Sequence, residues 1–178
     1  MPVTPAARRQ CAAALPDSFA TARSSPMTPT PIDPTHPQAL ALMAQSEALM
    51  TALYPSESNH FEPAENLRPP HAHFVGLWEG ERLMAIGGVK RMANDGDYGE
   101  IKRVFVDPAY RGRGLSRLIM AALEGHLRER GVGLARLGTG IPQPEALGLY
   151  RALGYVERKP FGGYAADPLS VFMEKPLA

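Results

Sequence analysis

The 178-residue sequence lacks the features that mark secreted, membrane or nucleic-acid-binding proteins. Its single cysteine, Cys11, excludes an internal disulfide and favours a reducing, cytoplasmic location. No apolar run approaches the roughly 20 residues of a membrane span. Lys and Arg number 19 against 18 for Asp and Glu, and this formal net charge of +1 argues against nucleic acid as a partner.

The first part of the chain has no hydrophobic period. Residues 1–34 are rich in Pro, Ala, Ser and Thr, a composition that buries too little apolar surface to offset chain entropy. We therefore predict a disordered or dispensable leader over residues 1–34 and a single domain over residues 35–178. Arginines among few acids faintly suggest a transit peptide, but we prefer a dispensable extension with Met27 as the true start.

Helix-like and strand-like segments alternate through the predicted domain. Helices are expected over residues 36–53, 115–130 and 144–154, and strands over 73–78, 82–92, 98–107, 134–140, 155–161 and 168–177. The first two strands form a hairpin through the turn EGE. This order of elements predicts a mixed α/β sandwich.

The stretch DPAYRGRGLSRL, residues 107–118, places two glycines where a helix begins. Glycine weakens a helical first turn, so a compensating interaction is expected. N–H groups at a helix start lack internal partners and attract anions, and Gly112 and Gly114 would let a phosphate approach this backbone. Arg111 and Arg113 would add charged donors. The alternative is a structural turn with surface arginines.

Two other phosphate-binding motifs do not match this stretch. A P-loop requires Gly-Lys-Ser/Thr, and no lysine follows these glycines. A Rossmann fingerprint requires a third small residue near the position of Leu118, and the acidic ribose ligand is also missing.

The segment VFVDPAYRGRGLSRLIMAALE resembles motif A of the GNAT superfamily of N-acetyltransferases, whose signature is [QR]-x-x-G-x-[GA] before a long helix. Arg111, Gly114 and Ser116 occupy the three signature positions, and Ser116 departs from the usual Gly or Ala. A second segment, QPEALGLYRALGY, resembles a later block of the superfamily. In that block Gln143 replaces the usual Asn and Tyr150 matches the family tyrosine.

The resemblance implies a GNAT-like fold that binds acetyl-CoA as co-substrate. Its central sheet would be mixed, mostly antiparallel and splayed at the acetyl-CoA site, with helices on both faces. The residues implied in binding acetyl-CoA are Val104, Phe105, Val106, Arg111, Gly112, Arg113, Gly114, Ser116, Gln143 and Tyr150.

The resemblance also implies two catalytic residues. Tyr150 falls where the family places a hydroxyl near the CoA sulfur, as a general acid; the alternative is a half-buried core aromatic. Glu100 begins a strand at which some members use a glutamate as general base through water. The alternative for Glu100 is a strand-end charge paired with Lys102 or Arg103.

The acceptor side would be formed by the connection after the first helix and by the glycine-flexible loop PFGGYAADP. Its aromatic and acidic side chains suit a cationic amine. The candidate substrate-binding residues are Tyr54, Glu57, His60 and Tyr164. The histidines His60, His71 and His73 do not have metal-ligand spacing, so we predict no metal.

These observations predict a cytoplasmic N-acetyltransferase that acts on a small-molecule amine, with neither nucleic acid nor membrane as a partner. The superfamily's frequent dimers imply a homodimer by analogy. Two alternatives stay open. One is a catalytically inactive regulator that binds CoA or acyl-CoA, and the other is an acetyltransferase of protein N-termini or lysines.

Overall fold

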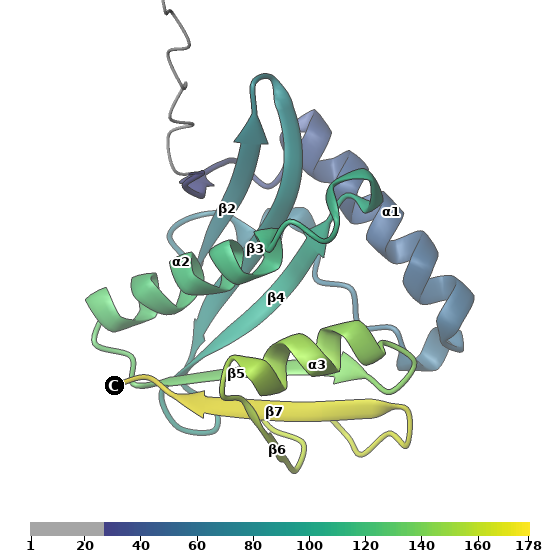
Figure 1. Ribbon diagram of the computed structural model, residues 1–178. Helices are drawn as coiled ribbons and strands as arrows, with labels where there is room; N and C mark the ends of the chain where they lie inside the picture. The colour runs from purple at the N-terminus through teal and green to yellow at the C-terminus, as the bar shows by residue number, and fades with distance from the viewer. Residues whose placement is uncertain (1–26) are drawn as a thin grey trace, which may run out of the picture.

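A seven-stranded mixed sheet is the framework of residues 27–178, the part of the chain that the computed structural model describes (Figure 1). Its strands are β1 (Thr30–Pro31), β2 (Ala72–Glu79), β3 (Arg82–Met92), β4 (Tyr98–Val106), β5 (Leu134–Gly140), β6 (Val156–Arg158) and β7 (Ser170–Pro176). They lie in the order β1-β2-β3-β4-β5-β7-β6, and of these neighbours β4 and β5 alone run parallel. The predicted mixed, mostly antiparallel sheet is confirmed.

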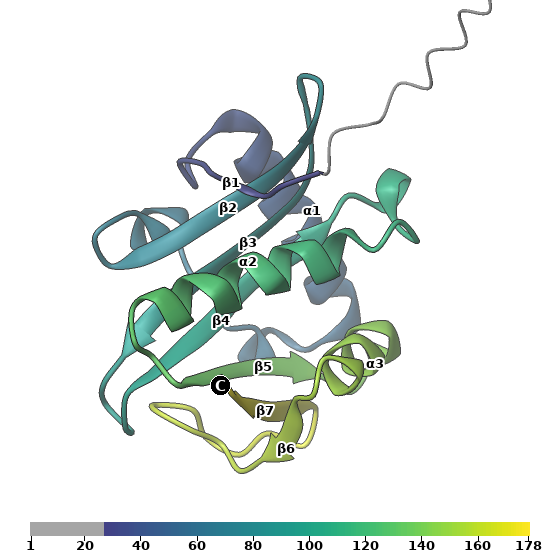
Figure 2. The same cartoon turned by 60° about the vertical axis from the view of Figure 1, so that its left-hand side comes forward.

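Helices of the described residues cover both faces of this sheet (Figures 1 and 2). They are α1 (Pro37–Leu53), α2 (Leu115–Glu129) and α3 (Pro144–Ala152), with short 3₁₀ segments η1 (Ser56–Ser58), η2 (Ala64–Leu67) and η3 (Pro108–Tyr110). Helices α2 and α3 join one core cluster, and α1 joins another on the opposite face. No helix within residues 27–178 is long and apolar enough to cross a membrane.

Helix α2 shows how the hydrophobic period becomes packing. Leu115, Ile119, Leu123 and Leu127 recur four residues apart, and all of them are buried. A Cβ built on Gly99 of β4 would lie 2.3 Å from a methyl carbon of Leu127, so a glycine there lets the helix approach the strand closely. This packing holds the C-terminal end of α2 against the start of β4.

A short strand lies before the predicted domain boundary at residue 35. Thr30 pairs with Gly76 and Pro31 with Val75, so β1 adds an edge strand to the sheet. The prediction missed this strand because two residues carry no period and proline is confined to sheet edges. The rest of the predicted leader, residues 1–26, lies outside the described residues, together with Cys11.

The parallel pair β4 and β5 separates soon after it begins. Its register holds two residue pairs, Gly99 with Ala135 and Glu100 with Arg136. Further along, the pairing of β4 with β3 is irregular, and Arg103 has a φ of +56° there. Because a β-bulge bends a strand and increases its twist, β4 turns away from β5 beyond Glu100 (Figure 1). The predicted splay is confirmed.

Candidate active site

Two adjoining cavities open where β4 and β5 separate. The cleft cavity, between the two strands, has a volume of about 230 Å³, and the outer cavity beside it has about 670 Å³. The residues that line both cavities are Ser58, His60, Glu62, Glu100, Lys102 and Tyr164. Each of the catalytic and substrate-binding residues predicted from the sequence lines one cavity or the other. The fold therefore brings these six predicted residues together around two adjoining cavities.

Glu100 lies at the junction of the two cavities and is 4% exposed. Its Oε1 accepts a hydrogen bond from the Tyr164 hydroxyl at 2.5 Å and forms an ion pair with Lys102 Nζ at 3.0 Å. Its Oε2 has no hydrogen-bond partner among residues 27–178, and no buried side-chain oxygen there is left unsatisfied and sealed from solvent. Glu100 thus has the ion pair expected for a strand-end charge, and it also keeps one oxygen available to the cavities.

Glu62 joins this arrangement from the connection after α1, and sequence reasoning missed it. Its two oxygens form ion pairs with Lys90 at 2.9 Å and with Lys102 at 3.4 Å. Burial opposes the charge of Lys102, yet Glu100 and the Tyr164 hydroxyl outweigh it and raise the pKa of Lys102 above its usual range. Lys102 therefore stays charged between two carboxylates. No local pattern marks Glu62, which lies between Phe61 and a proline in a stretch without period.

Tyr150 comes from α3 and lines the cleft cavity. The residue is 9% exposed and packs in the core with its ring 5.9 Å from that of Tyr155. Burial raises the pKa of Tyr150 to about 12, so the hydroxyl is protonated at neutral pH. Within the described chain this hydroxyl has no hydrogen-bond partner. Both interpretations of Tyr150 fit, because it is a core aromatic whose polar end reaches a cavity.

The N-terminus of α3 and the C-terminus of α1 meet beside the cleft cavity. Gln143 Nε2 donates to the Tyr54 hydroxyl at 3.0 Å, which joins a residue predicted to bind acetyl-CoA to one predicted to bind substrate. A Cβ built on Gly140 would lie 1.8 Å from the Tyr54 hydroxyl oxygen. The end of β5 must therefore be glycine for Tyr54 to occupy this place.

The glycine-rich turn after β4 lies outside both cavities and is open to solvent. Gly112 and Gly114 have φ values of +77° and +73°, and nothing lies within 4 Å of a Cβ built on either of them. Gly114 is the N-cap of α2 and gives it no side-chain hydrogen bond, while Ser116 in the first turn is half-buried. The N–H groups at this helix start thus face free space.

The two arginines of the turn have different partners. Arg113 forms an ion pair with Glu79 at 2.8 Å, and its guanidinium also lies 5.6 Å from the centre of the Tyr110 ring. Arg111 forms no ion pair with any residue in 27–178 and lies 5.9 Å from the centre of the Phe105 ring. Arg111 is therefore the more available cation for an anion at this turn.

Three residues at the end of β4 were predicted to bind acetyl-CoA, and of these Val104 alone lines one of the two cavities. Phe105 and Val106 are each 8% exposed and pack into core clusters on opposite faces of the sheet, whereas Val104 lines the cleft cavity. Arg103 donates to the Glu62 carbonyl at 2.7 Å and pairs with Glu47 on α1, so the bulge also ties α1 to the sheet.

The histidines of the acceptor side are separated from one another. His60 lines both cavities, with its ring 5.7 Å from that of Tyr164, while Glu57 lines the outer cavity. His73 stacks instead on His126 at 3.9 Å, where burial lowers the pKa of both rings. In residues 27–178 no group of three or more His, Cys, Asp or Glu is placed to hold a metal ion.

The chain is similar to known acetyltransferases in both sequence and structure. The profile of the acetyltransferase (GNAT) family matches residues 40–155, which contain both sequence segments described above. A relative from Azospirillum brasilense described as IAA acetyltransferase is 35% identical over 81% of this chain and 94% of its own length. A solved structure from Klebsiella pneumoniae, assigned as an acyl-CoA N-acyltransferase, is 36% identical with a TM-score of 0.72, covering 85% of this chain and 98% of its own.

A more distant structure shares the fold. It is PaiA N-acetyltransferase from Thermoplasma acidophilum in complex with coenzyme A, with a TM-score of 0.61 and 15% identity, covering 78% of this chain and 91% of its own.

Proposed function

Because this chain belongs to the GNAT family of acetyltransferases, we propose that it transfers an acetyl group directly from acetyl-CoA to the amine of a small molecule. One observation carries the proposal: Glu100 and Tyr150 line the same cavity at the splay of β4 and β5. In a direct transfer the amine nitrogen bonds to the thioester carbonyl carbon and the carbon–sulfur bond breaks. Starting from the neutral amine, the nitrogen loses one proton and the sulfur gains one; an acceptor that starts as an ammonium ion must lose a further proton first.

Two features of the fold support acetyl-CoA as the co-substrate, which would supply the activated acetyl group. Beyond Glu100, β4 has no registered partner on its β5 side, which leaves the backbone of residues 104–106 available to the pantetheine arm. The open N-terminus of α2 suits the pyrophosphate, because Gly112 and Gly114 carry no Cβ and Arg111 has no competing ion pair. Arg113 and Ser116 lie on either side of the N-cap Gly114 in the sequence, and Gln143 lines the cleft cavity together with Val104.

Glu100 is the proposed general base. An alkyl amine with a pKa of about 10 is almost wholly protonated at pH 7, so a proton must leave before or during attack. The Oε2 of Glu100 has no partner in the described residues and can accept that proton directly or through a water molecule. Lys102 and Tyr164 hold Oε1 and so fix the orientation of the carboxylate.

Tyr150 is the proposed general acid. Its pKa of about 12 keeps the hydroxyl protonated at every pH at which an amine can react. The hydroxyl can therefore hydrogen bond to the sulfur as negative charge develops and supply its proton.

The size of the outer cavity supports a small acceptor. A volume of about 670 Å³ lies within the range of about 300–1,000 Å³ that is typical of small-molecule sites. Glu57, His60 and Tyr164 would contact the acceptor there or at the junction, and Tyr54 would contact it from the cleft cavity. The relative described as IAA acetyltransferase points in the same direction.

A direct test is thiol release from acetyl-CoA in the presence of a panel of small amines, peptides with free N-termini and lysine peptides. We expect turnover with at least one small amine and an N-acetylated product of matching mass. Turnover confined to peptides would overturn the small-molecule assignment. Tight binding of CoA without turnover on any amine would favour the regulator that has lost catalysis.

Glu100→Gln tests the base. The variant loses the proton acceptor but keeps the shape of the side chain, so we expect kcat at pH 7 to fall on the order of 10²-fold. The pH–rate profile of the variant should differ in shape from that of the wild type. Glu129→Gln, on the exposed end of α2, is the matched control. An unchanged pH–rate profile in Glu100→Gln would remove Glu100 from the mechanism.

A further inference from the structure

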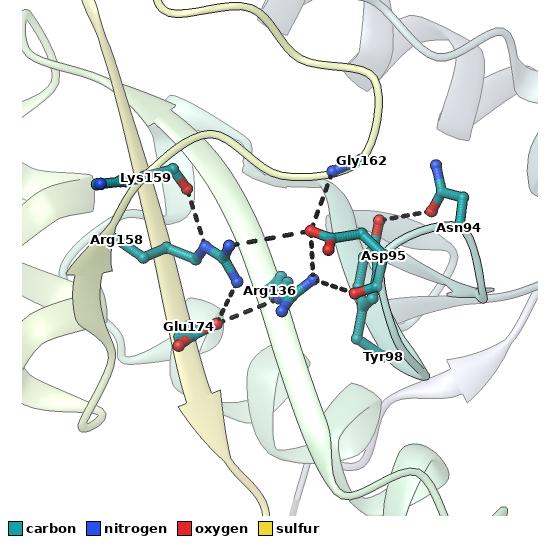
Figure 3. Close-up of polar contacts among 8 residues, drawn as sticks. All are labelled: Asn94, Asp95, Tyr98, Arg136, Arg158, Lys159, Gly162 and Glu174. Atoms are coloured by element: carbon teal, nitrogen blue, oxygen red, sulfur yellow. Dashed lines mark hydrogen bonds and ion pairs between the residues drawn. The ribbon is translucent and has the colours of Figure 1, made fainter.

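A polar cluster beside the outer cavity joins segments that are far apart in the sequence (Figure 3). It consists of Asp95 in the turn between β3 and β4, Arg136 on β5, Arg158 on β6, Gly162 in the following loop and Glu174 on β7. We refer to these five residues as the latch, and to residues 159–169 between β6 and β7 as the capping loop. None of the five latch residues takes part in the proposed acetyl transfer.

Asp95 contacts both sides of the latch. Its Oδ2 accepts from Arg136 Nη1 at 3.1 Å and from the backbone N–H of Gly162 at 3.4 Å. Its backbone carbonyl accepts from the same Nη1 at 2.8 Å. Arg158 Nη2 completes the group at 3.9 Å. One carboxylate thus connects the β3–β4 turn to the capping loop.

Arg136 is the buried member of the latch and is held in place by several partners. It is 8% exposed, its Nε pairs with Glu174 at 3.2 Å, and its guanidinium lies 4.4 Å from the centre of the Tyr98 ring. A buried guanidinium is costly unless its donors are paired. Removing the charge of Asp95 therefore leaves Arg136 Nη1 with the Asp95 backbone carbonyl but without its ion pair to the carboxylate, and it weakens the polar anchor of the capping loop.

The capping loop is shaped to meet this anchor. Gly162 has a φ of +59°, and a Cβ built on it would lie 2.9 Å from the Tyr98 hydroxyl. Phe161 is 2% exposed, and its ring lies 5.4 Å from the rings of both Tyr98 and Tyr164. The loop is therefore held where it passes closest to β4, two residues before Tyr164.

Tyr164 connects the capping loop to the active site. Its hydroxyl donates to Glu100 at 2.5 Å and accepts from Lys102 at 2.8 Å, and the residue lines both cavities. Burial and the nearby Glu100 carboxylate raise the pKa of Tyr164 to about 12, so the hydroxyl remains a donor at neutral pH. Tyr98 and Glu100 are two residues apart on β4, so the same face of that strand carries the latch contact and the proposed base.

We propose that Asp95 and Arg136 are positioning residues, which hold the capping loop over the outer cavity and set Tyr164 against Glu100. The inference rests on the proposed function and extends it to residues that do not touch substrate. It predicts that loosening the latch weakens use of the acceptor and leaves binding of acetyl-CoA unaffected, since none of the latch contacts reaches the turn at residues 107–116.

Asp95→Asn is the test variant. It removes the charge and keeps the size of the side chain, and Asn before Gly96 suits a tight hairpin turn. The matched control is Asp97→Asn in the same turn, where Asp97 pairs with Arg91 at 2.8 Å on the surface, with both side chains about half exposed. Each change removes one negative charge from the turn, so a general electrostatic effect would appear in both variants.

For Asp95→Asn we expect the acceptor KM to rise about tenfold, because small misplacements near reacting groups cost this much or more, while the KM for acetyl-CoA changes less than twofold. Amide hydrogen exchange in residues 161–166 should accelerate. Combining Asp95→Asn with Tyr164→Phe should cost no more than Tyr164→Phe alone. Asp97→Asn should behave as the wild type in every measurement.

An unchanged acceptor KM with unchanged exchange would overturn the proposal, as would equal effects in Asp97→Asn or a matching rise in the KM for acetyl-CoA. If the wild type turns over no amine, the proposed function fails. The exchange of residues 161–166 then still decides whether Asp95 holds the loop.

Discussion

The two ends of the proposed reaction cleft are built in opposite ways. The end at the glycine-rich turn consists of one continuous stretch, solvent-exposed, with donors from the backbone and glycines at positive φ. The end at Glu100 and Tyr164 is assembled from α1, the connection after it, β3, β4 and the capping loop, and its charges pair with one another. One end is open and local, whereas the other is closed and assembled from distant segments.

The difference agrees with what each end would recognise in the proposed reaction. A pyrophosphate carries its own charge and needs donors, which any helix start supplies through its backbone. An acceptor amine must lose a proton at a defined place, and this requires a carboxylate whose orientation is fixed by neighbours. Changes at the open end should therefore act on the binding of acetyl-CoA, and changes at the closed end on the use of the acceptor.

The largest effect is expected where the two ends meet, at Tyr150. Tyr150→Phe removes the hydroxyl but keeps the ring in the core, so kcat should fall about 10²-fold while stability changes little. Steady-state kinetics and thermal unfolding measure the two quantities. Tyr155→Phe is the control: its hydroxyl donates to buried Glu124 at 3.0 Å, so that variant should lose stability and keep kcat. Equal kcat in both variants would leave Tyr150 as a core aromatic alone.

The next effect is expected at the open end. Gly114→Val places a β-branched side chain beside the free N–H groups of α2, and the KM for acetyl-CoA should rise more than about tenfold. Valine at positive φ also costs about 1–3 kcal/mol of strain, so a control with equal strain is needed. Gly131→Val provides it, because Gly131 has a φ of +70° at the other end of the same helix, with no neighbour within 4 Å. A similar KM for acetyl-CoA in both variants would show that residues 107–118 form a structural turn and do not bind acetyl-CoA.

The smallest effect separates the two arginines of that turn. Arg111→Ala should raise the KM for acetyl-CoA about fivefold, since an exposed charge contact is worth about 1 kcal/mol. Arg113→Ala should raise it less than about twofold, because Glu79 already holds that guanidinium. Measuring both at two salt concentrations sharpens the comparison, since screening should reduce the effect of Arg111→Ala. The reverse order would show that Arg113 leaves Glu79 when acetyl-CoA binds.

The open end could be predicted because its signals are local. DPAYRGRGLSRL contains the strand end, the glycines and the helix start in twelve consecutive letters, and the structure places Gly114 at the N-cap of α2. The elements around it were predicted for the same reason, since the period of Leu115 to Leu127 is a property of neighbouring residues. β1 was missed because its two residues owe their structure entirely to pairing with β2.

The closed end could be predicted only in part. Glu100 and Tyr164 were named individually, but nothing in one sequence links residues 64 positions apart, and their hydrogen bond appears only in the fold. Glu62 and Lys102 were not assigned to the site, because charged residues in loops and strands usually lie in solvent. Their role comes from burial, which a single sequence does not encode locally.

The splay of β4 and β5 has a mechanical consequence. With two registered residue pairs, this junction divides the sheet into a part made of β1–β4 and a part made of β5–β7. A ligand that binds along β4 would contribute hydrogen bonds at a place in the middle of the sheet where the strands have few of their own. Acetyl-CoA would then join the two parts of the sheet as well as react, and each release of product would leave the junction with its two registered residue pairs again.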